Sequence, residues 1–305
     1  MKTEKIIVGE GTKYPLNGIL TLPEGAERFP AVVFVHGSGT SNMDEKVGKL
    51  TPFKDLAEGL AKHGIASLRY DKRSFAHGLK MMKEEITVRQ ETIEDAILAA
   101  DLLRRDSRID PERIFIAGHS MGAMLAPRID AEGGNFAGLI LMAGTLRTLD
   151  EVLLYQTREM IDGSGPLLKR ILNSQLKKYE QILGDLYSIS DTEAKQRKFG
   201  NGVNVYYFKE IGEHPASTYL ENTRKPILVM QGSRDLQVKA DLDFAGYQKL
   251  LGDRANVTFR LYEGLNHCFV PAICDNIIKA QKEFSKERHI GENVISDMAN
   301  WIKAQ

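Results

Sequence analysis

Short, mostly apolar runs recur along the chain. Runs that are rich in β-branched residues are typical of strands buried on both faces of a parallel sheet. They occupy residues 31–35, 65–71, 113–118, 138–144, 225–232 and 257–264. Residues 5–9 and 18–22 add two segments that predict an opening β-hairpin. The sequence therefore predicts an eight-stranded, mostly parallel sheet.

Amphipathic segments separate the predicted strands. In residues 51–64, apolar side chains recur at helical spacing, and Gly64 gives a stop signal. Residues 92–106 form a second amphipathic helix, in which Thr92 and Asp95 predict a capping box. The C-terminal residues close the chain with another amphipathic helix. Strands that alternate with helices predict an α/β fold in which helices flank both faces of the sheet.

The alternation breaks between residues 145 and 222. This segment is polar and mostly helical in pattern, with no run typical of a buried strand. It is too long for a plain loop. We expect a helical cap, or lid, at 145–222, inserted after the sixth strand of a core domain that comprises residues 1–144 and 223–305. Open α/β sheets bind ligands at the carboxyl ends of their strands, so the cap is expected to cover that edge.

The composition is that of an ordinary globular protein. Its main use is to exclude some classes of function. Lys plus Arg and Asp plus Glu each total 41, so no general attraction to nucleic acid follows. The two cysteines, Cys268 and Cys274, lack the spacing of a metal site or a disulfide framework. The sequence shows no signal-peptide pattern and no apolar stretch of membrane length. We expect a cytoplasmic protein without nucleic-acid or membrane partners, and a homodimer stays open.

The stretch Gly118-His119-Ser120-Met121-Gly122 carries the strongest chemical signal. It follows a predicted strand and precedes a predicted helix, which is the context of a nucleophile elbow. In that motif the serine lies on a sharp bend, and glycines let the strand and helix close around it. The helix N-terminus helps to stabilise negative charge. The alternative is an ordinary tight turn, but the strand and helix on either side favour the elbow.

Two further residues can complete a catalytic triad with Ser120. A serine hydroxyl needs a base, and the base needs an acid that orients it. In this kind of sheet the acid comes next along the chain and the histidine last. Asp235 and His267 each follow a predicted strand, so both are expected at the same sheet edge as Ser120. An Asp after a strand is often only a turn or cap residue, and Glu263 is then the reserve acid.

A glycine-rich loop at residues 36–39 (HGSG) follows the first buried strand. It would face the elbow across the sheet edge. We expect the backbone N–H groups of Ser38 and Met121 to form an oxyanion hole. The alternative is a glycine turn that caps the next helix. The residues expected beside the substrate are His36, Gly37, Gly39 and His119. Of these, His119 lies inside the elbow and also fits a structural role.

The motifs HGSG, RYDKR, GHSMG, QGSRD and NHCF occur in this order. The sequence in this respect resembles the α/β-hydrolase superfamily. More narrowly, it is similar to capped bacterial carboxylesterases related to serine aminopeptidases and dienelactone hydrolases. The resemblance runs from about residue 12 to the C-terminus. It implies the triad Ser120, Asp235 and His267 and an oxyanion hole at Ser38 and Met121.

Two loops depart from the pattern that such relatives often show. Where relatives often have an Asp-Arg-Asp-like opening after HGSG, this chain has TSNMDE at 40–45. Where relatives often have a glycine-rich tail after YDKR, it has SFAHG at 74–78. Both loops are expected to line the pocket entrance, where they would change substrate choice and leave the chemistry intact.

We expect a serine hydrolase of the carboxylesterase type that cleaves small carboxylic esters through an acyl-enzyme, with no metal or organic cofactor. Most apolar residues of the cap are expected in its own core, and some in an acyl or aryl pocket. One alternative is an aminopeptidase or amidase on small aminoacyl substrates. It would need a cap carboxylate for the α-ammonium, such as Glu159, Asp162 or Glu213. A second alternative is a non-catalytic ligand-binding protein, which predicts loss of a triad member, whereas all three are present.

Overall fold

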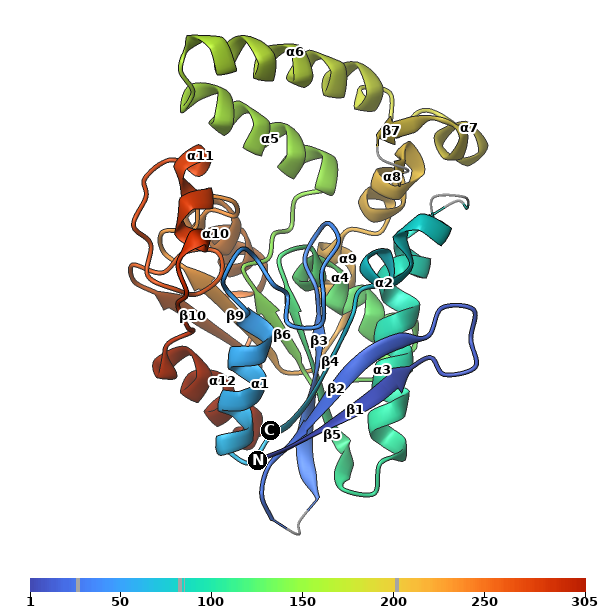
Figure 1. The fold of residues 1–305 in the computed structure, drawn as a ribbon, viewed down its shortest axis with the longest axis vertical. Coiled ribbons are helices and arrows are strands. Elements are labelled where there is room, and N and C mark those ends of the chain that lie inside the picture. Colours follow the sequence, from blue (N-terminus) through green and yellow to red (C-terminus); the bar gives the residue numbers. More distant parts are fainter. Residues whose placement is uncertain (26–27, 82–83, 85, 201–202) are drawn as a thin grey trace.

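A mixed sheet of eight strands forms the centre of the protein (Figure 1). The computed structural model describes residues 1–25, 28–81, 84, 86–200 and 203–305. The strands lie in the order β1-β2-β4-β3-β5-β6-β9-β10. Their bounds are β1 (Lys2–Val8), β2 (Leu16–Leu22), β3 (Phe29–Val35), β4 (Ala66–Tyr70), β5 (Ile109–His119), β6 (Leu139–Met142), β9 (Ile227–Gly232) and β10 (Val257–Tyr262). Strand β2 pairs antiparallel with β1 and β4, and the pairs from β4 to β10 are parallel. The predicted opening hairpin and mostly parallel sheet are confirmed.

Helices cover both faces of this sheet because successive strand residues point to opposite sides. In β3, Val33 and Val35 face one apolar cluster, whereas Val32 and Phe34 face the other. The first cluster is completed by α3 (Glu94–Arg105), α4 (Met121–Ile129), α9 (Ala216–Asn222) and α10 (Ala245–Leu251). The second is completed by α1 (Pro52–Lys62) and α12 (Glu292–Ala304). The sheet is therefore buried on both sides, as its continuous apolar runs predict.

The start of α3 differs from the expected capping box. A π-helical turn, η1 (Arg89–Ile93), runs directly into the helix, so Thr92 does not cap it. Thr92 is buried, and the Asp95 carboxylate lies 2.5 Å from the guanidinium of Arg73. The capping-box prediction is wrong because Asp95 pairs with a buried cation on α2 (Arg73–Met81), a helix that the sequence pattern did not predict.

The segment 145–222 joins β6 to β9 and is mostly helical, as expected. It contains α5 (Leu149–Asp162), α6 (Pro166–Leu183), α7 (Asp191–Gln196), the short pair β7 (Lys198–Gly200) and β8 (Val203–Asn204), α8 (Val205–Glu213) and α9. Figure 1 shows α5 and α6 together at the top of the molecule, beyond the sheet. The end of the segment is different, because Tyr207, Ile211 and Leu220 pack into the first core cluster. One part of the segment therefore extends the core, and the other projects from it.

Four short elements complete the chain: η2 (Asp130–Gly134), η3 (Ala240–Phe244), α11 (Ile277–Ala280) and η4 (Gln281–Ser285). The π-helical turn η3 runs into α10, so the two form one helical segment over residues 240–251. In the part of the chain that the structure describes, no helix has both the length and the apolarity needed to cross a membrane.

Candidate active site

Ser120 occupies a strained position between the end of β5 and the start of α4. Its φ of +54° and ψ of −117° lie outside the regions that L-residues usually adopt. The flanking glycines explain how this bend fits. A Cβ on Gly118 would lie 2.2 Å from the carbonyl oxygen of Gly122, and a Cβ on Gly122 would lie 2.2 Å from that of Val35. The close approach of strand and helix therefore admits no side chain at either glycine.

His267 and Asp235 form a buried, hydrogen-bonded pair at the same edge. Nδ1 of His267 lies 2.7 Å from Oδ2 of Asp235. The same carboxylate accepts hydrogen bonds from the Gln231 side chain at 2.9 Å and from the backbone N–H groups of Gln237 and Val238 at 2.8 and 3.0 Å. These bonds satisfy a carboxylate that is fully buried, and they fix it to receive Nδ1–H of the imidazole.

Glu263, the reserve acid, is exposed just beyond β10. The hydrogen bond from His267 goes to Asp235 instead. The geometry thus selects Asp235 as the carboxylate that orients the imidazole.

His119 connects the elbow to the His267 loop. Its Nε2 lies 2.9 Å from the backbone carbonyl oxygen of His267, and the two imidazole rings are 4.6 Å apart. Since His119 directly precedes Ser120, this contact holds the serine beside the histidine loop. Among the three residues predicted to form a triad, all within the described part of the chain, His267 and Asp235 are hydrogen-bonded, and the Ser120 hydroxyl shows no bond to the imidazole. Such bonds are often long before substrate binds.

Glu45 is the second partner of His119 and a residue that the sequence analysis missed. Its Oε2 lies 3.0 Å from Nδ1 of His119, although the two groups are poorly aligned for a hydrogen bond. Burial disfavours the imidazolium, but the charge of Glu45, the close contact with it and the bond to the His267 carbonyl together raise the pKa of His119. Burial likewise opposes ionisation of Glu45, but the charge and close contact of His119 and the N–H bond from Gly37 together lower the pKa of that carboxyl. The two groups therefore form a buried ion pair behind the elbow.

The loop at residues 36–39 lies directly against the elbow. A Cβ on Gly37 would come within 3.2 Å of the Ser120 Cβ. Oε1 of Glu45 accepts the Gly37 N–H at 2.8 Å. On the other side of the loop, Nζ of the buried Lys72 donates to the carbonyl oxygens of Gly37 at 2.9 Å and Gly39 at 3.0 Å. Two buried charged side chains therefore fix the backbone of this loop.

His36 lies beneath the loop and away from solvent. Burial lowers its pKa to about 4, so the imidazole is neutral near pH 7. Its Nε2 lies 3.1 Å from the carbonyl oxygen of Asn42, and its ring packs against Phe53. This environment is that of a structural histidine.

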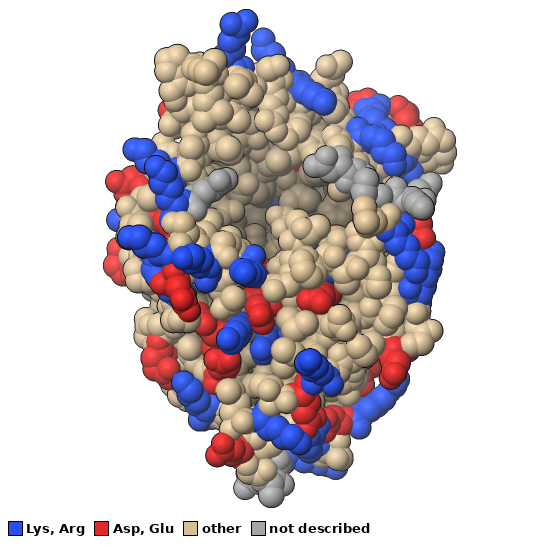
Figure 2. Space-filling model, in the orientation of Figure 1, with Lys and Arg blue, Asp and Glu red and all other residues tan. Residues whose placement is uncertain are grey.

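A cavity of about 960 Å³ opens above Ser120. Ser38, Gly39 and Met121 contribute to its wall, whereas His36, Gly37 and His119 do not line it. Most of the remaining wall is apolar and comes from α2, α4, α5, β7, β8 and α8. These apolar residues include Phe75, Met124, Leu149, Val152, Leu153, Phe199, Val203 and Phe208. Figure 2 shows a hollow below the α5–α6 hairpin with few charged side chains around it.

The two atypical loops differ in their relation to this cavity. Residues 74–78 line it as part of α2, as expected. In 40–45 only Thr40 does so, and that part of the expectation is wrong. The reason is that polar groups of loop 40–45 bond to residues at the end of β4. The Met43 N–H donates to Asp71, and Asp44 pairs with Arg69.

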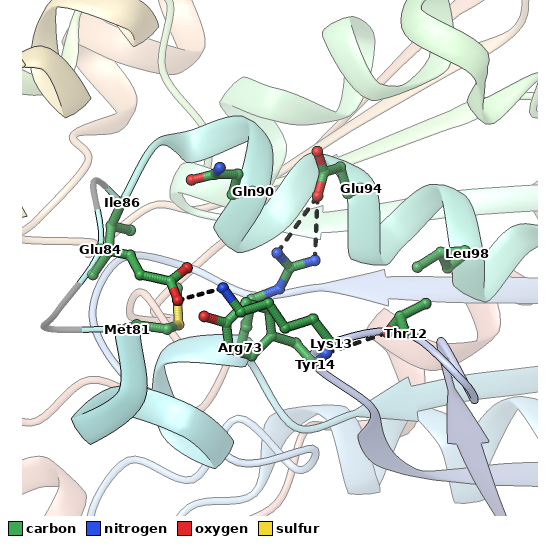
Figure 3. Close-up of a pocket in the computed structure, with 10 residues that line it drawn as sticks. All are labelled: Thr12, Lys13, Tyr14, Arg73, Met81, Glu84, Ile86, Gln90, Glu94 and Leu98. Carbon is green, nitrogen blue, oxygen red and sulfur yellow. Dashed lines mark hydrogen bonds and ion pairs between the residues drawn. The ribbon is translucent and has the colours of Figure 1, made fainter.

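A second cavity, of about 280 Å³, lies between α2, η1 and the loop after β1 (Figure 3) and shares Met81 and Ile86 with the first. Its charged side chains are already paired. Lys13 contacts Glu84 at 2.5 Å, and Arg73 contacts Glu94 at 3.4 Å. It contains none of the triad residues. In the described residues, no group of three or more His, Cys, Asp or Glu side chains is arranged to hold a metal ion.

Comparison with known proteins assigns the chain to a family of serine hydrolases. Residues 27–270 match the family model described as serine aminopeptidase, S33. The chain belongs to this family of α/β hydrolases. The S33 match includes the HGSG loop, the elbow, Asp235 and His267, since all lie inside the matched residues.

A sequence relative and a structural neighbour of this S33 member are named esterases, and a second structural neighbour is named Est1E. Esterase EstD of Thermotoga maritima is 34% identical over 287 residues, which are 94% of this chain but 65% of that longer protein. Est1E from Butyrivibrio proteoclasticus has a TM-score of 0.58 and 15% identity, over 99% of both chains. A Pyrococcus furiosus esterase also has a TM-score of 0.58, with 16% identity over 99% of this chain and 91% of its own. At these identities the two structures demonstrate the shared fold.

Proposed function

We propose that this S33-family protein is a serine carboxylesterase. The observation that carries the proposal is the strained Ser120, which His119 holds beside a histidine that is itself oriented by a buried carboxylate. A strained turn that exposes a serine next to a His–Asp pair is the arrangement of a nucleophilic hydrolase. The name of the 34% identical relative supports an ester as the substrate.

In the proposed reaction, Nε2 of His267 takes the proton from the Ser120 hydroxyl as its oxygen attacks the ester carbonyl. The negative charge that forms on the carbonyl oxygen is held by the N–H groups of Ser38 and Met121. The Met121 N–H is the first of α4, where amides have no partner within the helix. Protonated His267 then gives its proton to the leaving alcohol, and an acyl-enzyme remains. Water activated by His267 releases the acid and restores Ser120.

The cavity supports esters with an apolar acyl or aryl group. Its volume lies near the upper end of the roughly 300–1,000 Å³ typical of ligand pockets, so groups larger than acetyl fit. We propose that 145–222 acts as the cap, with 1–144 and 223–305 as the core domain, because α5 and α8 supply much of the apolar wall. We assign substrate contact to Ser38 and Gly39 and positioning roles to His36, Gly37 and His119.

The peptidase alternative has less support. None of Glu159, Asp162 and Glu213 lines the cavity, and Glu159 is paired with Lys239 at 2.5 Å. A carboxylate that does line it is Glu91, but its Oε2 accepts the hydroxyl of a tyrosine and lies near a lysine. An α-ammonium would have to compete with both groups. The cytoplasmic location, the homodimer and the lack of any cofactor stay predictions.

The test is initial rates on p-nitrophenyl esters from acetate to laurate and on an aminoacyl p-nitroanilide. Wild type should hydrolyse the shorter esters, whereas Ser120→Ala should abolish turnover. Ser296→Ala, at a half-buried serine on α12 whose hydroxyl bonds to Glu292, is the matched control and should match wild type. A fluorophosphonate probe should label the peptide that contains Ser120. Turnover of the anilide alone would favour the peptidase, and activity in Ser120→Ala would refute the mechanism.

A further inference from the structure

We propose that Lys72 is a positioning residue that orients and polarises the Ser38 N–H of the oxyanion hole. The proposal rests on the esterase function proposed above. Lys72 is 2% exposed and follows β4 at the same sheet edge as Ser120. It is not among the residues that line the cavity, so it acts on the substrate only through the backbone of the loop.

The geometry of one peptide unit gives Lys72 this role. The Gly37 carbonyl and the Ser38 N–H belong to the same planar peptide group, and the described chain contains no cis peptide bonds. In a trans peptide the carbonyl and the N–H point to opposite sides. Because Nζ of Lys72 holds the Gly37 oxygen at 2.9 Å, the Ser38 N–H is directed away from the lysine. Ser38 lines the cavity, whereas Lys72 does not.

Glycines make the loop dependent on such anchors. Gly39 has a φ of +81°, and neither Gly37 nor Gly39 has a side chain that could fix the backbone by packing. Lys72 bonds to the Gly37 and Gly39 carbonyls, and Glu45 bonds to the Gly37 N–H. Glu45 therefore fixes an N–H group of the loop, and Lys72 fixes two of its carbonyl groups.

The ammonium group of Lys72 is itself held in place by η1 and the inserted segment. It lies 3.6 Å from Oε2 of Glu91. The same oxygen accepts the hydroxyl of Tyr207 at 2.5 Å, and Tyr207 is on α8. Since Glu91 and Tyr207 are both buried, the carboxylate has few other partners and keeps the lysine directed at the loop.

The charge of Lys72 should act mainly in the transition state. A cation bonded to the Gly37 oxygen draws electrons through the peptide group and strengthens the Ser38 N–H as a donor. The acceptor is a neutral carbonyl in the bound ester and an oxyanion in the transition state, so the gain grows as charge develops. Loss of Lys72 should therefore lower kcat and leave KM nearly unchanged.

The experiment compares wild type, Lys72→Met, Glu91→Gln and the double variant Lys72→Met/Glu91→Gln. Because Glu91 lines the cavity, the double variant is measured against Glu91→Gln, so that the difference reports on Lys72. The double variant avoids leaving the Glu91 charge buried without its cation, so it remains testable if the single variant fails to fold. Lys72→Arg is the conservative rescue. Lys225→Met is the matched control, because Lys225 pairs with Asp130 at 2.8 Å and lies before β9, at the opposite end of that strand from Asp235.

The readouts are kcat and KM on p-nitrophenyl butyrate and the Ki of a trifluoromethyl ketone with the same propyl group. The ketone forms a serine adduct that bears an oxyanion, so it reports on the oxyanion hole. Fluorophosphonate titration corrects kcat for the fraction of active enzyme. We expect kcat in the double variant to fall roughly 10- to 100-fold, and Ki to rise by about the same factor as kcat/KM falls. KM should change less than about threefold, and Lys72→Arg should recover part of the loss.

Three results would overturn the role of Lys72. They are unchanged kcat and Ki in a folded double variant, a rise in KM without a fall in kcat, or a fall in kcat without a matching rise in Ki. The last two would mean that Lys72 shapes the cavity or supports folding only. Activity in Ser120→Ala would instead refute the esterase mechanism, so the two failures are distinguishable.

Discussion

The edge of the sheet that carries Ser120 and the projecting α5–α6 hairpin are built in opposite ways. At the sheet edge, Asp235 is 3% exposed and accepts four hydrogen bonds. In the 18 residues of α6, by contrast, Leu172 and Leu183 are the buried ones, and Leu167 is 78% exposed. At the sheet edge, the proposed chemistry and the stability of the fold therefore depend on the same packed groups. On the exposed face of α6, side chains can change without disturbing either.

The largest effect is expected at Asp235, the proposed acid of the triad. Asp235→Asn should lower kcat about 10⁴-fold, because an amide favours the wrong tautomer of His267. The structure should survive, since an Asn oxygen can still accept the N–H groups of Gln237 and Val238. Steady-state kinetics with thermal unfolding separates the two effects. Asp253→Asn, at an exposed turn, is the control. A loss of less than tenfold would show that Asp235 is not the orienting acid.

The second effect tests how closely the edge is packed. Gly122→Ala should lower the free energy of unfolding by about 3 kcal/mol, because its Cβ would meet backbone atoms of Val35 and His36. Gly165→Ala, which precedes α6 and faces open space, should change it by less than about 0.5 kcal/mol. Urea unfolding measures both. Equal losses at the two glycines would mean that the hairpin is as closely packed as the elbow.

Much of this edge could be predicted from the sequence because its signals are local. Glycines on either side of Ser120 and residues at the ends of buried strands place the triad without knowledge of long-range contacts. Asp235 and His267 are indeed bonded in the structure. Their catalytic roles stay predictions until Ser120 and Asp235 are substituted.

What could not be predicted depends on contacts between distant residues. Glu45 lies in a loop with no periodicity, and its importance appears only when it meets His119, far along the chain. The RYDKR motif includes Lys72, but nothing local shows that its side chain bonds to Gly37. The capping box failed for the same reason, since Asp95 pairs with Arg73. Local patterns gave no information about these buried charge pairs.

The third largest effect is expected at the buried pair of Glu45 and His119. Glu45→Gln keeps an acceptor for the Gly37 N–H but removes the charge beside His119. The raised pKa of His119 adds stability that is complete below its usual 6.5 and is lost as pH rises through the folded value. The lowered pKa of Glu45 adds stability above its usual 4.5, which is lost on acidification. The variant should therefore lose about 2 kcal/mol near pH 5.5 and less near pH 9.

Unfolding by urea at the two pH values measures this difference. Glu159→Gln on α5 is the matched control, because its ion pair with Lys239 is about one-third exposed and should contribute less than about 0.5 kcal/mol. A loss for Glu45→Gln that is independent of pH would mean that the carboxylate serves only as an acceptor for the loop.

The smallest effect is expected on α6 itself. The double variant Leu167→Ser/Ile171→Ser should change the free energy of unfolding by less than about 1 kcal/mol, since both side chains are mostly exposed and only helix propensity is lost. Rates on short esters should match wild type, because neither residue lines the cavity above Ser120. Leu56→Ala in α1, fully buried, should instead cost about 2–5 kcal/mol. If the α6 variant lost as much as Leu56→Ala, its apolar face would be covered in solution, and sedimentation of wild type and variant would then test the open homodimer prediction.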